Sequence, residues 1–260
     1  MLLYEHPLSS YVQKVKIALR EKNIPFTVER PDRLGSGSAA GAFLDGNLRA
    51  EVPMLVDGTV RIVDSTIILE YLEDKVPTPA LLPRDPAARA RARMIEDMCD
   101  TSYEAVNWGI GEILWFHRAE GALEARLRDA AAAQTTKIRH WLEQQLGERA
   151  WFNGDHFGWA DLSVAPYLNR SVLFGMGPAT DTPLDLWLTR IRQRPSVAKT
   201  FEEFMAAQAQ MSDAFRRLES GEMRREYRDH RLEWMIKSGG MEVVLDGIAK
   251  NNIRFTWPTV

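Results

Sequence analysis

The chain has 260 residues, of which 45% are hydrophobic and 27% charged, a composition typical of globular proteins with a sizeable core. Its formal net charge of −3 excludes a strongly basic surface, so we expect no nucleic-acid partner. Cys99 is the single cysteine, which excludes an internal disulfide and an all-cysteine zinc site, and we expect no metal. Residues 1–6 lack a signal-peptide pattern and no apolar run is long enough to cross a bilayer. We therefore expect a cytoplasmic protein that does not bind membranes.

The first 76 residues alternate between strand and helix patterns. Short apolar runs predict strands at Met1–Glu5 and Pro25–Arg30, and helical spacing of apolar residues predicts a helix at Tyr11–Glu21. Asp57-Gly58 is a strong hairpin signal. The remaining expected elements of this α/β domain are strands at Pro53–Val56 and Thr59–Val63 and a helix from Ser65, its expected N-cap, to Asp74.

A proline-rich linker precedes a region with only helical patterns, residues 86–210. Four prolines lie between residues 77 and 86, and a helix cannot continue through such a segment. The first long helix of the second domain carries an apolar stripe of Ile95, Cys99, Val106, Ile110 and Ile113, and the next one a stripe of Leu127, Ala131, Ile138, Leu142 and Leu146. The first, third, fourth and fifth expected helices are Ala87–Arg118, Trp159–Phe174, Leu184–Arg192 and Val197–Gln208.

The last fifty residues, 211–260, form a separate segment. Mixed charges and apolar residues predict helices at 222–237 and Met241–Ala249, and residues 253–257 suit an extended conformation. Trp234, Phe255 and Trp257 are unusual in disordered chains. We therefore expect a helical extension that packs on the body.

Two adjacent hydroxyls, Ser9 and Ser10, stand between the first strand and the first helix. A helix N-terminus presents unpaired N–H groups and a partial positive charge, which favour a bound anion. If that anion is a thiolate, a hydroxyl beside it can donate a hydrogen bond and stabilise it. The alternative is that both serines only cap the helix, because serine is a preferred N-cap residue.

Four motifs follow one another along residues 1–210. They are SSYVQKVKIAL at Ser9–Leu19, NLRAEVPML at Asn47–Leu55, DSTIILEYL at Asp64–Leu72 and GWADLSVAP at Gly158–Pro166. Together they resemble the glutathione transferase superfamily, of the serine type. In two of them the chain departs from the family pattern: Leu48 replaces the usual proline after Asn47, and Gly158 replaces the usual Ser or Thr.

This resemblance implies a thioredoxin-like N-terminal α/β domain (1–76), an all-α domain (86–210) and a C-terminal helical extension (211–260). It also implies a homodimer with glutathione as co-substrate. Ser9 matches the hydroxyl that stabilises the glutathione thiolate, and Ser10 would be the cap or a second donor. Members with cysteine at this position perform thiol exchange, and Cys99 lies far from it.

The resemblance also implies the glutathione-binding residues. The Val52–Pro53 bond would be cis, which would expose the Val52 backbone to the cysteinyl part of glutathione; an ordinary strand-opening proline is the alternative. Asp64 and Ser65 would hold the γ-glutamyl group, although Ser65 could be a plain cap. Arg49 is the nearest candidate for the glycyl carboxylate.

A small hydrophobic electrophile would bind between the two domains. Tyr11, Trp108, Trp115 and Phe116 are candidates to line its pocket, although aromatic residues at helical spacing are usually core residues. His117, His140 and His156 show no metal-binding spacing.

Several functions would use the same glutathione site. The enzyme would perform conjugation, displacement or ether cleavage, or glutathione-dependent isomerisation. In a different class, the fold would serve as a non-catalytic binding or assembly module, or the C-terminal extension would cover the site while the protein binds another chain.

Overall fold

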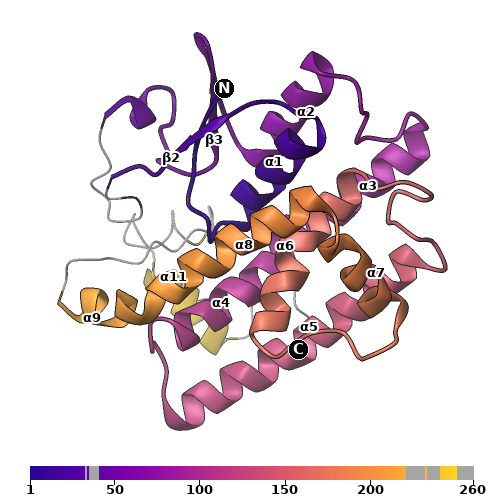
Figure 1. Cartoon of the computed structure of the whole chain (residues 1–260). Helices are drawn as coiled ribbons and strands as arrows, with labels where there is room; N and C mark the ends of the chain where they lie inside the picture. Colours follow the sequence, from indigo (N-terminus) through magenta and orange to yellow (C-terminus); the bar gives the residue numbers. More distant parts are fainter. Residues whose placement is uncertain (33, 35–40, 221–231, 233–240, 251–260) are drawn as a thin grey trace.

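The computed structural model describes residues 1–32, 34, 41–220, 232 and 241–250. Within these residues, the N-terminal part forms a four-stranded sheet in the order β2-β1-β3-β4 (Figure 1). β1 is parallel to β2 and antiparallel to β3, and β3 is antiparallel to β4. The elements are β1 (Leu2–Tyr4), α1 (Ser10–Glu21), β2 (Thr27–Glu29), the 3-10 helix η1 (Gly41–Leu44), β3 (Met54–Asp57), β4 (Val60–Val63) and α2 (Ser65–Lys75).

The expected α/β domain is confirmed, because each predicted strand and helix is present within two residues of its expected bounds. Alternation along the strands separates the two faces of the sheet. Leu3 and Leu55 are fully buried in the main core, which α1 and α2 share. Tyr4 and Met54, one residue away on each strand, instead pack with Phe43 of η1.

The helical second domain is also confirmed (Figure 1). Its central helix is α6, which is buried along nearly its whole length. Its elements are α3 (Pro86–Met98), the π-helical turn η2 (Cys99–Tyr103), α4 (Glu104–Leu114), α5 (Gly121–Leu146), α6 (Trp159–Leu173), α7 (Pro183–Arg192) and α8 (Pro195–Gln208). After them come η3 (Ala209–Asp213), α9 (Ala214–Glu219) and α11 (Met241–Ala249).

The prediction of one regular helix over Ala87–Arg118 is wrong in two respects. A π-helical turn at Cys99–Tyr103 interrupts the regular hydrogen bonding, and the helix ends at Leu114. The chain leaves the helix because His117 has a φ of +47°, in the left-handed region that ends helices. The predicted apolar stripe survives the interruption, and all five of its residues are buried.

The second predicted stripe is correct only for its last four residues. Ala131, Ile138, Leu142 and Leu146 are buried, but Leu127 is 41% exposed. Residues 121–130 at the start of α5 are almost all exposed. The apolar spacing there continues beyond the part of the helix that other elements cover.

The start of α6 explains why Gly158 replaces a Ser or Thr cap. A Cβ atom at this position would lie 1.8 Å from Nδ2 of Asn153 and 2.5 Å from the Leu81 carbonyl oxygen. Asn153 accepts a hydrogen bond from the Ala160 N–H at 3.1 Å, which an N-cap side chain would otherwise do. Asp161 accepts the Gly158 N–H at 3.0 Å. The side chain of Asn153, in the loop before α6, therefore caps this helix in place of residue 158.

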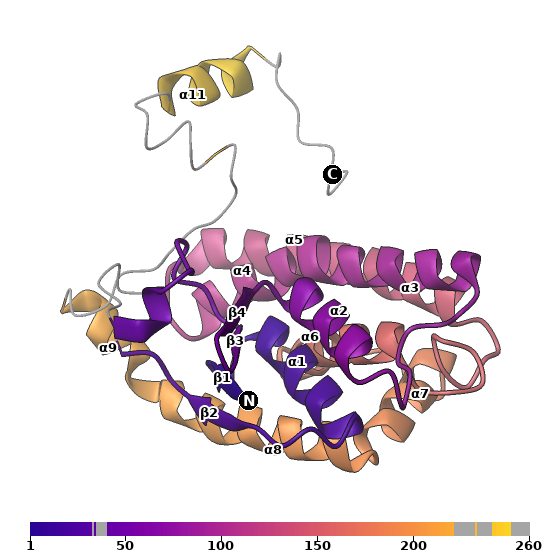
Figure 2. The same ribbon diagram turned by 90° about the horizontal axis from the view of Figure 1, so that it is seen from above.

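Ion pairs from α1 join the two domains. In Figure 2, α1 lies between α2 and α8, and it contacts both. Lys16 is 2% exposed and pairs with Glu5 at 2.6 Å and with Glu203 of α8 at 2.5 Å. Lys22, 5% exposed, pairs with Glu73 of α2 at 2.6 Å and donates to the Pro79 carbonyl of the linker. Glu5 and Glu73 belong to the first domain, whereas the Lys16–Glu203 pair crosses to the second. Buried charges must be paired, so the Lys16–Glu203 pair constrains how the two domains pack.

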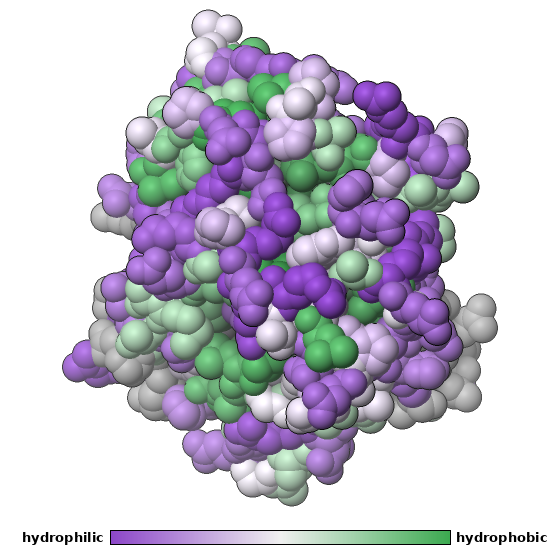
Figure 3. All heavy atoms as spheres, turned by 45° about the vertical axis from the view of Figure 1, so that its right-hand side comes forward, coloured by the Kyte–Doolittle hydropathy of each residue, from purple (hydrophilic) through white to green (hydrophobic). Residues whose placement is uncertain are grey.

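The surface shown in Figure 3 has several small hydrophobic patches between hydrophilic residues. Among the described residues, no helix has both the length and the apolar character that a membrane span requires. The predicted helix at 222–237 and the extended segment at 253–257 lie almost entirely outside the described residues, whereas the helix Met241–Ala249 is present as predicted.

Candidate functional site

Three of the predicted binding segments meet at one end of the sheet. Tyr4 is paired with Met54, and Met54 is paired with Val63. Because these strands are antiparallel to their neighbours, the end of β1, the start of β3 and the end of β4 lie together. At that end of the sheet the strands are followed or preceded by the Ser9 turn, the Val52–Pro53 segment and the Asp64-Ser65 pair.

Ser9, and not Ser10, is the N-cap of α1. Its Oγ accepts a hydrogen bond from the Val12 N–H at 3.4 Å, and its backbone is extended. Capping uses a lone pair of the hydroxyl, which keeps its proton for donation to a ligand. Ser10 is the first helical residue and is fully buried, and its Oγ has no hydrogen-bond partner among the described residues. Ser10 was expected as the cap or a second donor, and it is not the cap, because the helix begins one residue earlier than predicted. Its role as a second donor stays a prediction.

The Val52–Pro53 peptide bond is cis, as the resemblance implied. Pro53 is buried, while Val52 is only partly buried. The segment before it forms a turn that the buried Asn47 side chain holds, because Asn47 accepts from the Glu51 N–H and donates to the Glu51 carbonyl. Arg49 lies on this turn with a 56% exposed side chain and pairs with Glu51 at 2.7 Å.

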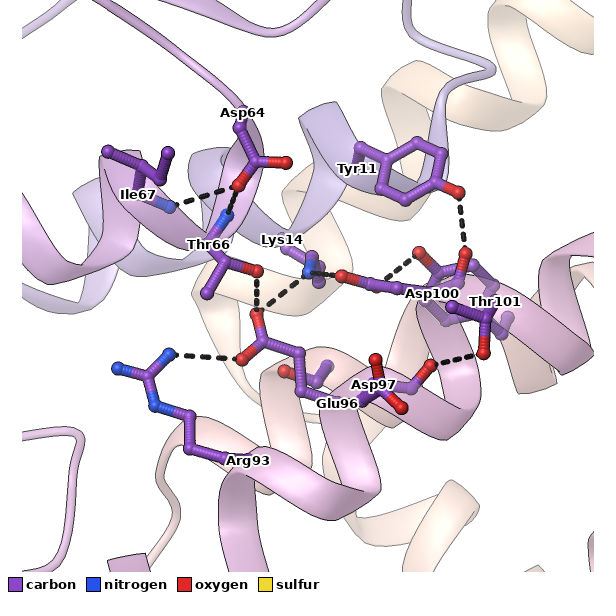
Figure 4. A network of polar contacts seen from close by, with 12 residues as sticks. Tyr11, Lys14, Asp64, Thr66, Ile67, Arg93, Glu96, Asp97, Asp100 and Thr101 are labelled. Carbon is purple, nitrogen blue, oxygen red and sulfur yellow. Dashed lines mark hydrogen bonds and ion pairs between the residues drawn. The ribbon is translucent and has the colours of Figure 1, made fainter. Parts of the chain in front are cut away.

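Asp64, and not Ser65, caps α2. The Asp64 carboxylate accepts from the N–H groups of Thr66 at 2.9 Å and Ile67 at 3.1 Å (Figure 4). The prediction that Ser65 is the N-cap is wrong, because the preceding residue, Asp64, occupies that position. Asp64 has a φ of +76°, which sets the turn into the helix. Asp64 is exposed and Ser65 is buried as the first residue of the helix.

A buried ion cluster lies behind these segments, between α1 and the helical domain (Figure 4). Lys14 is fully buried and donates to Glu96 at 2.9 Å and to Asp100 at 2.5 Å. Glu96 also accepts the Thr66 hydroxyl at 2.8 Å, which joins the cluster to the start of α2. The Asp100 carboxylate accepts the Tyr167 hydroxyl at 2.6 Å. We call Lys14, Glu96 and Asp100 the Lys14 cluster.

The pKa values in this cluster reflect competition between burial and charge pairing. Burial alone would lower the pKa of Lys14, but Asp100 and Glu96 outweigh it and raise that pKa. Burial opposes ionisation of Glu96 as well, yet Lys14 and the hydrogen-bond donors hold the pKa of Glu96 below its usual value. Burial raises the pKa of Asp100, and the nearby Glu96 charge adds to the effect.

The helical domain holds the Ser9 turn on both sides. The Tyr11 hydroxyl donates to the Asp100 carbonyl oxygen at 2.6 Å, and burial raises the Tyr11 pKa, so this hydroxyl stays protonated. Arg170 of α6 donates to the Leu8 carbonyl oxygen, directly before Ser9. Lys14, Asp100 and Arg170 were not predicted as parts of the site, because a charged residue in a helix normally indicates a solvated surface.

The four predicted pocket aromatics do not gather around one cavity. Trp115 lines a surface cavity of about 250 Å³ and packs edge-on against Phe174 at 5.2 Å. Phe116 is 3% exposed and therefore a core residue, Trp108 is half-buried, and Tyr11 faces Asp100 and Tyr167. Among the described residues, no three His, Cys, Asp or Glu side chains form a group that could hold a metal ion.

Comparison with known proteins shows the family of this chain. The family models "Glutathione S-transferase, N-terminal domain" and "Glutathione S-transferase, C-terminal domain" match residues 3–80 and 116–190. The maleylacetoacetate isomerase of Pseudomonas aeruginosa is 30% identical over 217 residues, which cover 80% of this chain and 95% of that protein. Glutathione S-transferase 2 of Saccharomyces cerevisiae is 30% identical over 216 residues, 78% of this chain and 90% of that protein.

Among solved structures, rice glutathione S-transferase GST1 in complex with glutathione has a TM-score of 0.65 and 25% identity to this chain. The match covers 82% of this chain and 96% of that one. The chain belongs to the glutathione S-transferase family. Its relatives include enzymes named glutathione S-transferase, and the chain is an enzyme of this kind.

Proposed function

We propose that this enzyme is a serine-type glutathione transferase, in which the Ser9 hydroxyl stabilises the glutathione thiolate and the thiolate attacks a small hydrophobic electrophile. The observation that carries the proposal is the position of Ser9. It caps α1 through a lone pair, it is only partly buried, and it lies at the sheet edge that also presents Val52 and Asp64. Ser10 is a weaker candidate because its hydroxyl is fully buried.

The expected size of the effect follows from hydrogen-bond energies. A cysteine-like thiol has a pKa of about 8.5, so only a few per cent is thiolate at neutral pH. A hydrogen bond to a charged group contributes roughly 1.5–3 kcal/mol, and one pKa unit corresponds to about 1.4 kcal/mol. One hydroxyl donor therefore lowers the thiol pKa by about one to two units. The partial positive charge at the start of α1 acts in the same direction.

The remaining binding roles follow the chemistry of each segment. The Asp64 carboxylate already accepts the Thr66 and Ile67 N–H groups, so the γ-glutamyl carboxylate would bind at the hydroxyl and N–H of Ser65. The γ-glutamyl amino group suits the exposed Asp64 carboxylate. The Val52 backbone, next to the cis bond, would pair with the cysteinyl amide. Arg49 would leave Glu51 and bind the glycyl carboxylate, because its side chain is the exposed cation on the adjacent turn.

Two enzyme functions can follow from the glutathione thiolate that Ser9 stabilises. The cavity beside Trp115 is the candidate site for a hydrophobic electrophile. The 30% identity to a maleylacetoacetate isomerase over 95% of that protein supports glutathione-dependent isomerisation as the second candidate. Both begin with the same thiolate. A homodimer, as is usual in the family, is part of the proposal.

The experiment is to measure the pKa of bound glutathione from the ultraviolet absorption of its thiolate, in the parent and in Ser9→Ala. We expect the alanine variant to raise this pKa by about one to two units and to slow conjugation at neutral pH by one to two orders of magnitude. Glutathione affinity should change little. Ser10→Ala serves as the comparison: if it raises the pKa and Ser9→Ala does not, Ser9 is not the donor.

A further inference from the structure

A buried arginine of the helical domain contacts the backbone next to Ser9. Arg170 of α6 is 4% exposed and donates from Nη2 to the Leu8 carbonyl oxygen. Its Nη1 binds both carboxylate oxygens of Glu104 in α4, at 3.1 and 3.3 Å. The guanidinium group therefore joins three segments that are far apart in the sequence.

A hydrogen bond to the Leu8 carbonyl restricts the backbone of Ser9 and, through it, the place of the Ser9 side chain. The Leu8–Ser9 peptide is rigid and planar, so fixing the carbonyl oxygen of Leu8 also fixes the N–H of Ser9. That N–H donates to the His6 carbonyl at 2.8 Å. With the peptide held at both ends and Val12 bound to Oγ, Ser9 keeps φ at −75° and ψ at 119°. The position of its Oγ is thereby restricted.

The contribution of the Arg170 contacts to the stability of the fold does not explain them well. A buried ion pair often contributes no more than a well-packed apolar pair of the same volume. In addition, the Nε of Arg170 is buried and has no partner among the described residues, which costs free energy. Glu104 balances the charge of Arg170, whereas the bond to Leu8 serves neither charge balance nor secondary structure.

We propose that Arg170 is a positioning residue for the thiolate donor: it holds the Leu8–Ser9 peptide so that the Ser9 hydroxyl points at the glutathione sulfur. This inference rests on the proposed function of Ser9. Arg170 acts through Ser9 and does not touch the substrate. The planar guanidinium can bind the Leu8 carbonyl and the Glu104 carboxylate at the same time, which the single ammonium group of lysine cannot do in the same geometry.

The test is a double-mutant cycle between Ser9 and the arginine pair. Replacing Arg170 alone would leave Glu104 uncompensated, so the pair is removed together as Arg170→Met with Glu104→Gln. The bound-glutathione thiol pKa and kcat/KM are measured for this variant in the parent and in the Ser9→Ala background. Arg91→Met is the matched control, because Arg91 also donates to backbone carbonyls of the helical domain, those of Gln145 and Phe152.

In the parent, we expect the paired variant to raise the thiol pKa by about one unit and to lower kcat/KM at neutral pH about tenfold. In the Ser9→Ala background it should change neither quantity further. Arg91→Met should leave the thiol pKa unchanged. If the paired variant does not fold, as judged by circular dichroism, Arg170→Lys is used instead, with a rise of the thiol pKa expected again.

The outcomes separate this inference from the proposed function. An unchanged thiol pKa in the paired variant or in Arg170→Lys overturns the inference, and so does an equal loss of kcat/KM in both Ser9 backgrounds. If Ser9→Ala itself leaves the thiol pKa unchanged, the proposed function fails and this inference fails with it. A pKa change in Ser9→Ala without one in the arginine variants refutes the inference alone.

Discussion

Replacing Lys14 by methionine should destabilise the protein strongly. The side chain is fully buried between two carboxylates, Glu96 at 2.9 Å and Asp100 at 2.5 Å. Methionine fills a similar volume, so the main effect is electrostatic. Removing one partner of a buried ion pair costs about 3–5 kcal/mol because the other charge stays buried and uncompensated.

This loss is large compared with ordinary stabilities, which are about 5–15 kcal/mol. It corresponds to a fall of about 10 °C in the melting temperature of a protein of this size. The assay is urea denaturation followed by tryptophan fluorescence, with the parent beside it. Lys199→Met is the matched control, because Lys199 pairs with Glu202 on the surface and both side chains are more than half exposed. We expect no measurable shift of its denaturation midpoint.

A second variant tests the physical reason. Combining Lys14→Met with Glu96→Gln and Asp100→Asn removes the uncompensated charges and should recover most of the lost stability. If Lys14→Met denatures at the same urea concentration as the parent, Lys14 does not stabilise the fold by compensating the charges of Glu96 and Asp100. If the triple variant is less stable than Lys14→Met, the loss comes from packing or hydrogen bonds and the electrostatic reasoning is wrong.

Two further predictions concern stability. Gly158→Ala should lower the free energy of unfolding by roughly 1–3 kcal/mol, because its Cβ would overlap the Asn153 side chain and the Leu81 carbonyl; an unchanged midpoint in urea would contradict this. The folded pKa of Glu96 lies below its usual value of 4.5, so its stabilisation is present above about pH 4.5 and is lost as the pH falls through the folded pKa. The difference in unfolding free energy between the parent and Glu96→Gln should therefore be constant from pH 7 to pH 5 and shrink at lower pH. A difference that grows towards acid would show the opposite shift.

The sequence predicted the fold well because its signals are local. The Asp57-Gly58 turn and the proline-rich linker each act over fewer than a dozen residues, and apolar periodicity is a property of a single helix or strand. Most predicted elements within the described residues lie near their expected positions, although the expected helix Ala87–Arg118 is interrupted by a π-helical turn and ends at Leu114. Helix caps were less certain, since neighbouring Ser and Asp residues cap equally well. The N-caps in the structure are Ser9 and Asp64, each one residue before the expected cap.

The long-range part of the site could not be predicted in this way. Lys14 finds its partners 82 and 86 positions further along the chain, and Arg170 reaches back 162 positions to Leu8. The π-helical turn at Cys99–Tyr103, which includes Asp100, has no pattern that marks it in a single sequence. Trp108 in α4 and Trp115 and Phe116 just after it were also hard to assign, because helical spacing does not distinguish core residues from pocket residues.

The buried lysines of α1 limit how this protein can be recombined with its relatives. Lys14 and Lys16 belong to the first domain, but Glu96, Asp100 and Glu203 belong to the second. In a chimera that joined residues 1–76 to another helical half, Lys16 would keep Glu5, but Lys14 would lose both of its acidic partners. A helical half that replaces this one must therefore supply carboxylates at the positions of Glu96 and Asp100, because a buried lysine without them would be uncompensated.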